Sequence, residues 1–285
     1  MRGREPGILT GAKWAALAAL LVAAGCQTQP TNFGRPDDTV DSAAGSQANI
    51  ASLSEVIAKS PSDANGYNVR GTAYGRAGKL HEAIADFDAA LKLNPNFFQA
   101  YANRALVQRK LGHTDLALAD YNKAIEINQR YAVAYVGRGN IYRESNRLDQ
   151  ALADFNQAIS LDANDPRAFH NRGLIYQAKG QHPQAIDDFS KAISLAPGNA
   201  EPFEGRGLSY LATGDYKAAL EDFNEAVKRD KESYAAWTDQ GLALEKLGMR
   251  DKAFAAFAHA SSLNPTYAPA VAGMRRTSGP IQRTT

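Results

Sequence analysis

The residues that could carry catalysis or bind a metal do not fall in a recognised pattern in this sequence. The histidines do not form H-E-x-x-H or another ligand spacing, which argues against a metal site. Gly78-Lys79 lacks the upstream glycine of a phosphate-binding loop and is followed by Leu80. We therefore expect no metal and no cofactor. The five histidines are His81, His113, His170, His182 and His259.

The single cysteine, Cys26, favours a different chemistry. One cysteine excludes an internal disulfide framework and a cysteine-rich zinc site. The basic residues Arg2, Arg4 and Lys13 come before or just at the start of an apolar stretch, residues 14–24, that leads to Gly25-Cys26. This stretch is much shorter than the ~20 apolar residues of a membrane-spanning helix and is typical of a secretory signal. An ordinary cleaved signal with a coincidental cysteine is the alternative.

The ending on Gly25-Cys26 resembles a bacterial lipoprotein signal, whose cysteine is lipidated and becomes the mature N-terminus. The resemblance implies a signal peptide over 1–25 and a lipidated, palmitate-carrying Cys26 that begins a flexible tether over 26–47. Gln27 and Thr28 stand where an aspartate would imply retention in the inner membrane. The resemblance therefore implies an outer-membrane anchor, with the body of the protein facing the periplasm.

The charge of the chain offers no support for a nucleic-acid partner. Residues 1–25 contain three basic residues and Glu5, so the remaining chain has 29 basic and 29 acidic residues. A nucleic-acid binder would usually show a basic excess to meet the phosphates. We expect protein partners, with membrane attachment through a lipid anchor only.

A period of 34 residues runs from residue 64 to residue 267, six times. Within this period, positions 4 and 24 are always aromatic, positions 20 and 27 are always alanine, and position 8 is glycine or alanine. Small residues let two helices approach closely while the rings fill the space between them. Position 15 predicts a left-handed residue that ends a first helix; it is Gly78, Gly112, Asn146, Gly180, Gly214 and Gly248.

These signature positions resemble the tetratricopeptide repeat (TPR) pattern across residues 64–267. The resemblance implies an all-α fold, an α-solenoid in which helix-turn-helix repeats form a right-handed superhelix. Residues 48–63 match the second half of a preceding repeat, and residues 268–285 are expected to form a closing helix and a disordered tail. Atypical ends are expected, because a stacked repeat cannot leave an apolar face in water.

Two positions carry charges that the family pattern does not require. Position 7 is arginine and position 23 is aspartate in the first five repeats, and both are lost in the sixth, as Gln240 and Ala256. The joint loss predicts pairing within a repeat rather than with the next one. A row of arginines awaiting an anionic ligand is the alternative. The predicted pairs are Arg70–Asp86, Arg104–Asp120, Arg138–Asp154, Arg172–Asp188 and Arg206–Asp222.

The first helices are expected to line a concave groove that is basic and amide-rich in repeats one to four and acidic and apolar in repeats five and six. Such a groove suits an extended peptide, although a solvated helix face is the simpler alternative. The acidic and apolar end includes Glu204, Leu208, Leu211 and Asp239. The predicted partner-binding residues are Asn68, Arg76, Asn103, Arg109, Lys110, Asn140, Arg143, Arg167, His170 and Asn171.

The repeats occupy nearly all of the chain after the signal, so we expect a protein that is not an enzyme. The architecture resembles the NlpI-type outer-membrane lipoproteins, which implies a periplasmic adaptor that scaffolds envelope proteins such as proteases or hydrolases. A pilotin-like or barrel-assembly accessory subunit and a protein that binds cell-wall fragments are the alternatives. A homo-oligomer is compatible with each of these three functions.

Overall fold

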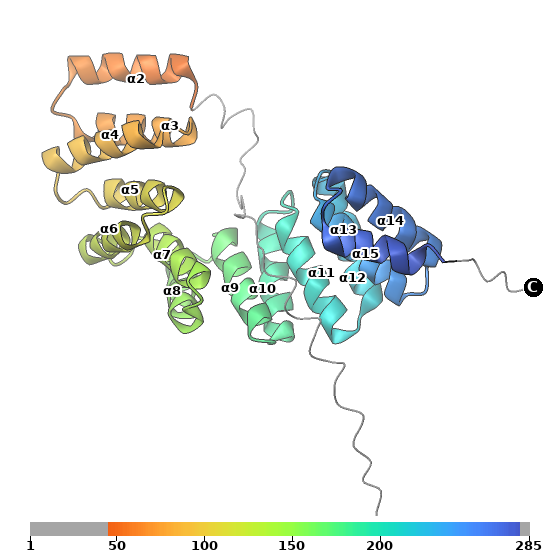
Figure 1. Ribbon diagram of the computed structural model, residues 1–285. Coiled ribbons are helices and arrows are strands. Elements are labelled where there is room, and N and C mark those ends of the chain that lie inside the picture. Colours follow the sequence, from red (N-terminus) through yellow and green to blue (C-terminus); the bar gives the residue numbers. More distant parts are fainter. Residues whose placement is uncertain (1–44, 280–285) are drawn as a thin grey trace, which may run out of the picture. The chain divides into compact units, whose positions relative to one another are not determined.

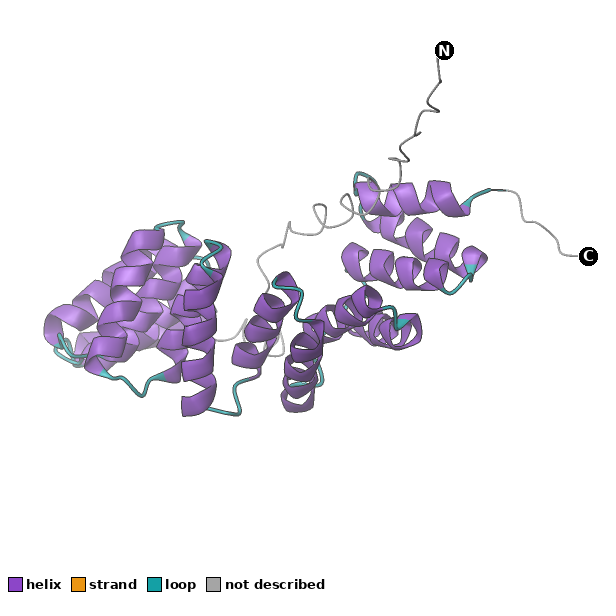
Figure 2. Ribbon diagram, turned by 90° about the horizontal axis from the view of Figure 1, so that it is seen from below, coloured by secondary structure: helices purple, strands orange, loops and turns teal. Residues whose placement is uncertain are grey.

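The structure, a computed structural model, describes residues 45–279. In this range every regular element is an α-helix (Figure 2), and the helices follow one another in chain order (Figure 1). The helices are α2 (Gln47–Lys59), α3 (Ala64–Arg76), α4 (Leu80–Leu93), α5 (Phe98–Lys110), α6 (Thr114–Ile127), α7 (Ala132–Glu144), α8 (Leu148–Leu161), α9 (Pro166–Ala178), α10 (His182–Leu195), α11 (Glu201–Thr213), α12 (Tyr216–Arg229), α13 (Tyr234–Lys246), α14 (Arg250–Leu263) and α15 (Ala268–Thr277).

Each repeat is an antiparallel pair of helices, a first helix of 13 residues and a second helix of 14. The second helix also packs on the first helix of the next repeat, so the pairs stack as an α-solenoid. Successive first helices, such as α5 and α7, touch each other as well, whereas no comparably close pair of second helices occurs between residues 45 and 279. We call the surface that the first helices α3, α5, α7, α9, α11 and α13 share the first-helix face.

The turn between the two helices of a repeat confirms the prediction made from position 15. The five glycines there have φ between 70° and 87°, and Asn146 has φ 57°. Asn146 is the one non-glycine residue with positive φ in the described part of the chain. This left-handed conformation ends the first helix, and asparagine tolerates it better than most residues with a side chain.

The core is built from the aromatic residue at position 24 of each repeat. These six rings are at most 3% exposed. The small residue at position 8 of the same repeat makes room for the ring: a Cβ on Gly71 would lie 2.9 Å from Cε1 of Phe87, and one on Gly241 would lie 2.7 Å from Cε1 of Phe257. Aromatic rings and small residues are therefore complementary parts of one packing arrangement.

The stack is closed by a single helix at each end. At the start, α2 packs on α3, begins at Gln47 and is capped by the Ser46 side chain. Helix formation thus starts at the last residue of the predicted tether, one residue before the predicted half-repeat, because Ser46 satisfies a backbone N–H of the first turn. At the other end, α15 packs on α13 and α14. Residues 1–44, which include the expected signal peptide, Cys26 and most of the expected tether, lie outside the described residues, as do residues 280–285.

Candidate functional site

In the first five repeats, the arginine at position 7 forms a two-point ion pair with the aspartate at position 23 of the same repeat. In the third repeat, Nε and Nη2 of Arg138 donate to the two carboxylate oxygens of Asp154 at 2.9 and 2.7 Å. The side chains are 19% and 7% exposed, so the pair lies largely out of water. The other four pairs have the same geometry: Arg70–Asp86, Arg104–Asp120, Arg172–Asp188 and Arg206–Asp222.

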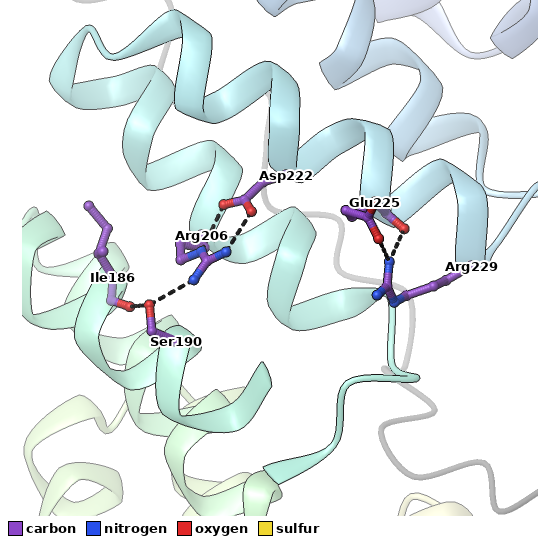
Figure 3. Close-up of polar contacts among 6 residues, drawn as sticks. All are labelled: Ile186, Ser190, Arg206, Asp222, Glu225 and Arg229. Carbon is purple, nitrogen blue, oxygen red and sulfur yellow. Dashed lines mark hydrogen bonds and ion pairs between the residues drawn. The ribbon is translucent and has the colours of Figure 1, made fainter. Parts of the chain in front are cut away.

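Each of these arginines also reaches back to the preceding repeat, which the sequence analysis did not anticipate. Figure 3 shows Arg206 between Asp222 on α12 and Ser190 on α10, with Ser190 bonded in turn to the carbonyl of Ile186. Nη1 makes this second contact, always with a side chain sixteen residues earlier. The five acceptors are Ser54, Asp88, Asn122, Asn156 and Ser190.

The arginine row thus joins neighbouring repeats and does not await a ligand. Besides its hydrogen bonds, each guanidinium lies near the aromatic ring at position 4, as for Arg138 at 5.6 Å from the Tyr135 centroid. In the second repeat, bonding to Asp120 and Asp88 raises the pKa of Arg104 against the lowering effect of burial. All three nitrogens of each guanidinium thus donate to side chains of the protein itself.

Several amides expected to meet a peptide are engaged within the protein. Asn103 on α5 donates from Nδ2 to Oδ1 of Asn68 at 3.0 Å and lies 3.4 Å from the hydroxyl of Thr72, both on α3. Asn171 donates to the carbonyl of Arg167 in the previous turn of α9. These contacts join or stabilise first helices, so Asn68, Asn103 and Asn171 are not simply solvated amides.

His170 is not a surface residue, contrary to its expected place in the groove. It is 1% exposed, and its ring lies 5.6 Å from the ring of Phe189. Burial, and secondarily the charge of Arg143, lowers the pKa of His170 to about 3. The imidazole is therefore neutral at physiological pH and part of the core.

The basic residues of the first-helix face differ in their surroundings. Nη1 of Arg109 donates to Oε1 of Glu144 at 2.6 Å, and Arg167 donates through Nε and Nη2 to Asp165, the N-cap of α9. Arg109 is therefore held by an acid that α7 supplies outside the repeat pattern. Lys110 and Arg76 are exposed at the ends of α5 and α3.

Arg143 on α7 is the exception among these residues. Its side chain makes no hydrogen bond or ion pair within residues 45–279, and its Nε is buried without a partner. Burial, followed by repulsion from Arg109, lowers its pKa, and the nearby charge of Glu144 opposes this. One helical turn earlier, Oδ1 of Asn140 is also buried without a partner. A donor and an acceptor are therefore left unsatisfied on one side of α7.

Tyr121 brings a hydroxyl to the same region, and the sequence analysis treated it only as a core ring. A Cβ on Gly137 of α7 would lie 2.5 Å from this hydroxyl, so the ring extends into the space that a side chain at 137 would fill. The hydroxyl makes no hydrogen bond within the described chain, and Arg109 and Arg167 both lie near enough to lower the pKa of Tyr121. Burial is the larger effect and raises this pKa, so the phenol stays protonated.

The other end of the first-helix face is acidic. Glu204 on α11 and Asp239 on α13 are half-buried carboxyls on neighbouring first helices. Burial, then Glu201 and Asp230, raises the pKa of Glu204 to about 7. Burial, then Glu204, raises the pKa of Asp239 well above its ordinary value. Leu208 and Leu211, expected to be groove residues, instead pack partly buried against the core at Phe223.

Arg229, which interrupts the apolar pattern of α12, is explained by its contacts. Its guanidinium lies 4.0 Å from the centroid of Phe203 and donates to Glu225 and to the carbonyl of Pro197 (Figure 3 shows the contact with Glu225). It thereby covers the aromatic ring in place of an aliphatic side chain.

Two classes of site find no support between residues 45 and 279. No group of three or more histidine, cysteine, aspartate or glutamate side chains is arranged to hold a metal ion. Within the same range, none of the helices has the length and apolar character needed to span a bilayer.

Three protein-family models match this chain, and all three describe the tetratricopeptide repeat. Tetratricopeptide repeat models match residues 64–97, 98–131, 166–199 and 205–268, and a TPR repeat model matches residues 139–180. Among curated proteins, none matches this chain.

Solved structures share the fold at low sequence identity. A chain of the APC/C hetero-tetramer Cut9-Hcn1 superposes with a TM-score of 0.75 at 18% identity, covering 85% of this chain and 48% of that one. This chain therefore spans about half the length of that relative. Pseudomonas aeruginosa pilF gives 0.69 at 20% identity over 75% of this chain and 97% of its own. YrrB, described as a TPR protein with an unusual peptide-binding site, superposes with a TM-score of 0.56 at 23% identity, covering 66% of this chain and 97% of its own.

Proposed function

Because the chain belongs to the tetratricopeptide repeat family, we propose that it is a non-catalytic scaffold whose first-helix face holds a polypeptide partner. Proteins of this fold act generally through protein–protein interaction, and YrrB is described as having a peptide-binding site. The observation that carries the proposal is the uneven use of polar groups on this face. The position-7 arginines are satisfied by the protein, whereas Arg143 and Asn140 on α7 are not.

The cellular setting is a second part of the proposal. Residues 1–25 have the composition of a secretory signal, and Cys26 stands where a bacterial lipoprotein is lipidated. We place the repeats in the periplasm, tethered through Cys26 to the outer membrane, where they would scaffold envelope proteins as the NlpI-type lipoproteins do. A lipid anchor and a binding face together would concentrate a soluble partner at the membrane.

A photo-crosslinking amino acid tests the binding face in the full-length chain in its native envelope. Val133 on α7 is 39% exposed on the first-helix face, and Leu116 on the second helix α6 is 55% exposed and serves as the matched control. We expect crosslinks to soluble polypeptides from position 133 and far fewer from position 116.

The identity of the crosslinked species separates the alternatives. Several soluble hydrolases or proteases support the adaptor, and one fixed membrane-protein partner supports an accessory subunit of an envelope machine. Cell-wall fragments without any polypeptide, or equal crosslinking from both positions, contradict the proposal.

A further inference from the structure

Arg143 carries a positive charge to which no acid of residues 45–279 is bonded. Arg109 from α5 lies near Arg143 from α7, and Arg109 and Arg167 from α9 both lie near Tyr121. Arg109 is paired with Glu144 and Arg167 with Asp165, but Arg143 has no acid bonded to it. A half-buried guanidinium that repels its neighbour and has an unpaired Nε lowers stability, so its presence calls for a compensating group outside the chain.

The phenol of Tyr121 adds an uncharged donor to this group. Five repeats have phenylalanine at position 24, and only the second has tyrosine. Its hydroxyl extends to Gly137, where the missing side chain leaves α7 bare, and it lies near Arg109 and Arg167. A core ring needs no hydroxyl for packing, as the five phenylalanines show. The hydroxyl therefore has a role at the surface of α7 rather than in the core.

The unpaired groups on α7 also define what the ligand must offer. Nε of Arg143 needs an acceptor, and Oδ1 of Asn140, three residues earlier on the same side of the helix, needs a donor. A bare anion would satisfy the arginine and leave the amide oxygen unpaired. An acidic residue within a polypeptide supplies both, a carboxylate for the arginine and a backbone N–H for the asparagine.

We propose that Arg143, Arg109 and Tyr121 bind the carboxylate of an acidic peptide residue, while Asn140 accepts a hydrogen bond from the peptide backbone. This inference rests on the proposed function and names the chemistry of its ligand. It also distinguishes the site from the arginine row at position 7, whose guanidinium groups already hold aspartates.

Two variants test the site with little effect on the fold. Tyr121→Phe removes one hydroxyl and restores the residue found in the other five repeats. Arg143→Gln removes a charge that has no ion-pair partner in the described chain. Arg130→Gln, in the exposed loop between α6 and α7, is the control with the same change in net charge. Thermal melting of each variant checks that the fold is kept.

Fluorescence anisotropy would measure binding of three labelled probes to the full chain: an amidated peptide containing glutamates, the same peptide with glutamines, and the glutamine peptide with a free C-terminal carboxylate. Inorganic phosphate serves as a competitor. We expect the glutamate peptide to bind roughly 10-fold or more tightly than its amidated glutamine counterpart, with an affinity that falls with salt. Tyr121→Phe and Arg143→Gln should each weaken it by roughly 10-fold, and Arg130→Gln by less than about 2-fold.

If the glutamine peptide with a free C-terminus binds more tightly than the amidated glutamine peptide, the carboxylate that the site binds lies at the end of the peptide. This result would also support the site. Equal binding of the amidated glutamate and glutamine peptides, no effect of the two variants, or no binding of any peptide would overturn it. A further variant, Asn140→Ala, tests the contact with the peptide backbone. If millimolar phosphate fully displaces the peptide and Asn140→Ala leaves peptide affinity unchanged, the ligand is a bare anion and the proposal is overturned. Crosslinking from position 133 tests the proposed function separately from the carboxylate site. If it captures polypeptides while none of these probes binds, the proposed scaffold function is supported and the carboxylate site is overturned.

Discussion

Gln240 on α13 donates a hydrogen bond from Nε2 to Oδ1 of Asn224 on α12, at 2.7 Å. This contact has the same sixteen-residue spacing as the backward contact of each position-7 arginine. The sixth repeat has thus lost the ion pair with position 23, where Ala256 stands, and kept the bond to the preceding repeat. The two functions of the arginine, pairing within a repeat and joining two repeats, are separable.

The ion pair in the third repeat should contribute measurably to stability. Exposed pairs are worth about 0–1 kcal/mol, whereas removing one partner of a fully buried pair costs about 3–5 kcal/mol. Because Arg138 and Asp154 are 19% and 7% exposed, we expect an intermediate loss for Asp154→Ala or Arg138→Leu, on the order of 1–3 kcal/mol. Urea denaturation measures the loss.

The double variant Arg138→Gln/Asp154→Ala copies the sixth repeat and should recover much of this loss, since the introduced glutamine could still bond to Asn122. Arg138→Leu/Asp154→Ala is the matched control, which removes the backward contact too. Strictly additive losses in both double variants would contradict the coupling.

The fold could be predicted from the sequence because the repeat constrains each position six times over. The left-handed turn at Asn146 and the buried ring of Phe155 follow from period and residue type alone. The within-repeat partner of Arg138 followed from the joint loss in the sixth repeat, and Asp154 lies where that argument placed it.

The details of the candidate site could not be predicted, because they depend on residues that depart from the period. Glu144 meets Arg109 across two first helices, and no other repeat has this pair. His170 occupies a groove position, yet local packing against Phe189 buries it. The hydroxyl of Tyr121 reaches α7 only because residue 137 is glycine. The contacts of Arg109 with Glu144 and of Tyr121 with Gly137 join two repeats, which a one-repeat pattern does not encode.

Cys26 should carry the membrane attachment of the chain. We predict that Cys26→Ser releases the protein from the outer membrane or leaves it unprocessed with residues 1–25 attached. Stable anchoring takes more than one acyl chain, and bacterial lipoproteins carry several, so loss of the lipidated residue should be decisive. Fractionation and mass spectrometry of the N-terminus measure this. Mature protein still found in the outer-membrane fraction would contradict the lipoprotein assignment.

Arg250 should hold the closing helix in place. Its Nε and Nη2 donate to the carbonyls of Thr277 and Arg276 at 3.1 and 2.9 Å, at the end of α15 where carbonyls lack a partner within the helix. Arg250→Met keeps much of the apolar stem and loses both bonds, so we expect faster amide hydrogen exchange across α15, with a cost of about 1–2 kcal/mol. Lys252→Met, an exposed residue of the same helix α14, is the control. Unchanged exchange in α15 would exclude this capping role.

Charge reversal at Arg109 and at Lys110 should have different effects, although the two residues are adjacent. Lys110 is exposed, and Lys110→Glu should change the free energy of unfolding by less than about 0.5 kcal/mol. Arg109→Glu would place a carboxylate beside Glu144, so we expect a loss on the order of 1 kcal/mol that shrinks with added salt. Arg109→Glu/Glu144→Arg should restore stability. Equal melting of the two single variants would show that the pair with Glu144 contributes nothing.

The acidic end of the first-helix face should make stability fall as pH rises. The folded pKa of Glu204 is about 7 because of burial and the nearby Glu201 and Asp230, and that of Asp239 is also raised. In the unfolded chain these carboxyls ionise near pH 4, so between about pH 4 and 7 the folded state binds more protons than the unfolded one. By linkage, their contribution to the free energy of unfolding decreases through this window and is lowest above pH 7.

Glu204→Gln should therefore have little effect at pH 4 and raise the melting temperature at pH 8, by roughly 2–4 °C for each kcal/mol relieved. Tyr267 lies near the same carboxyls, but burial raises the pKa of its phenol. The change in stability between about pH 4 and 7 is therefore due to the carboxyls and not to Tyr267. Glu221→Gln, an exposed acid on α12, should shift the melting temperature equally little at both pH values. The melting temperatures of Glu204→Gln and Glu221→Gln could instead depend on pH in the same way. Ionised Glu204 would then cost the fold nothing, and the prediction for Glu204 and Asp239 would be wrong.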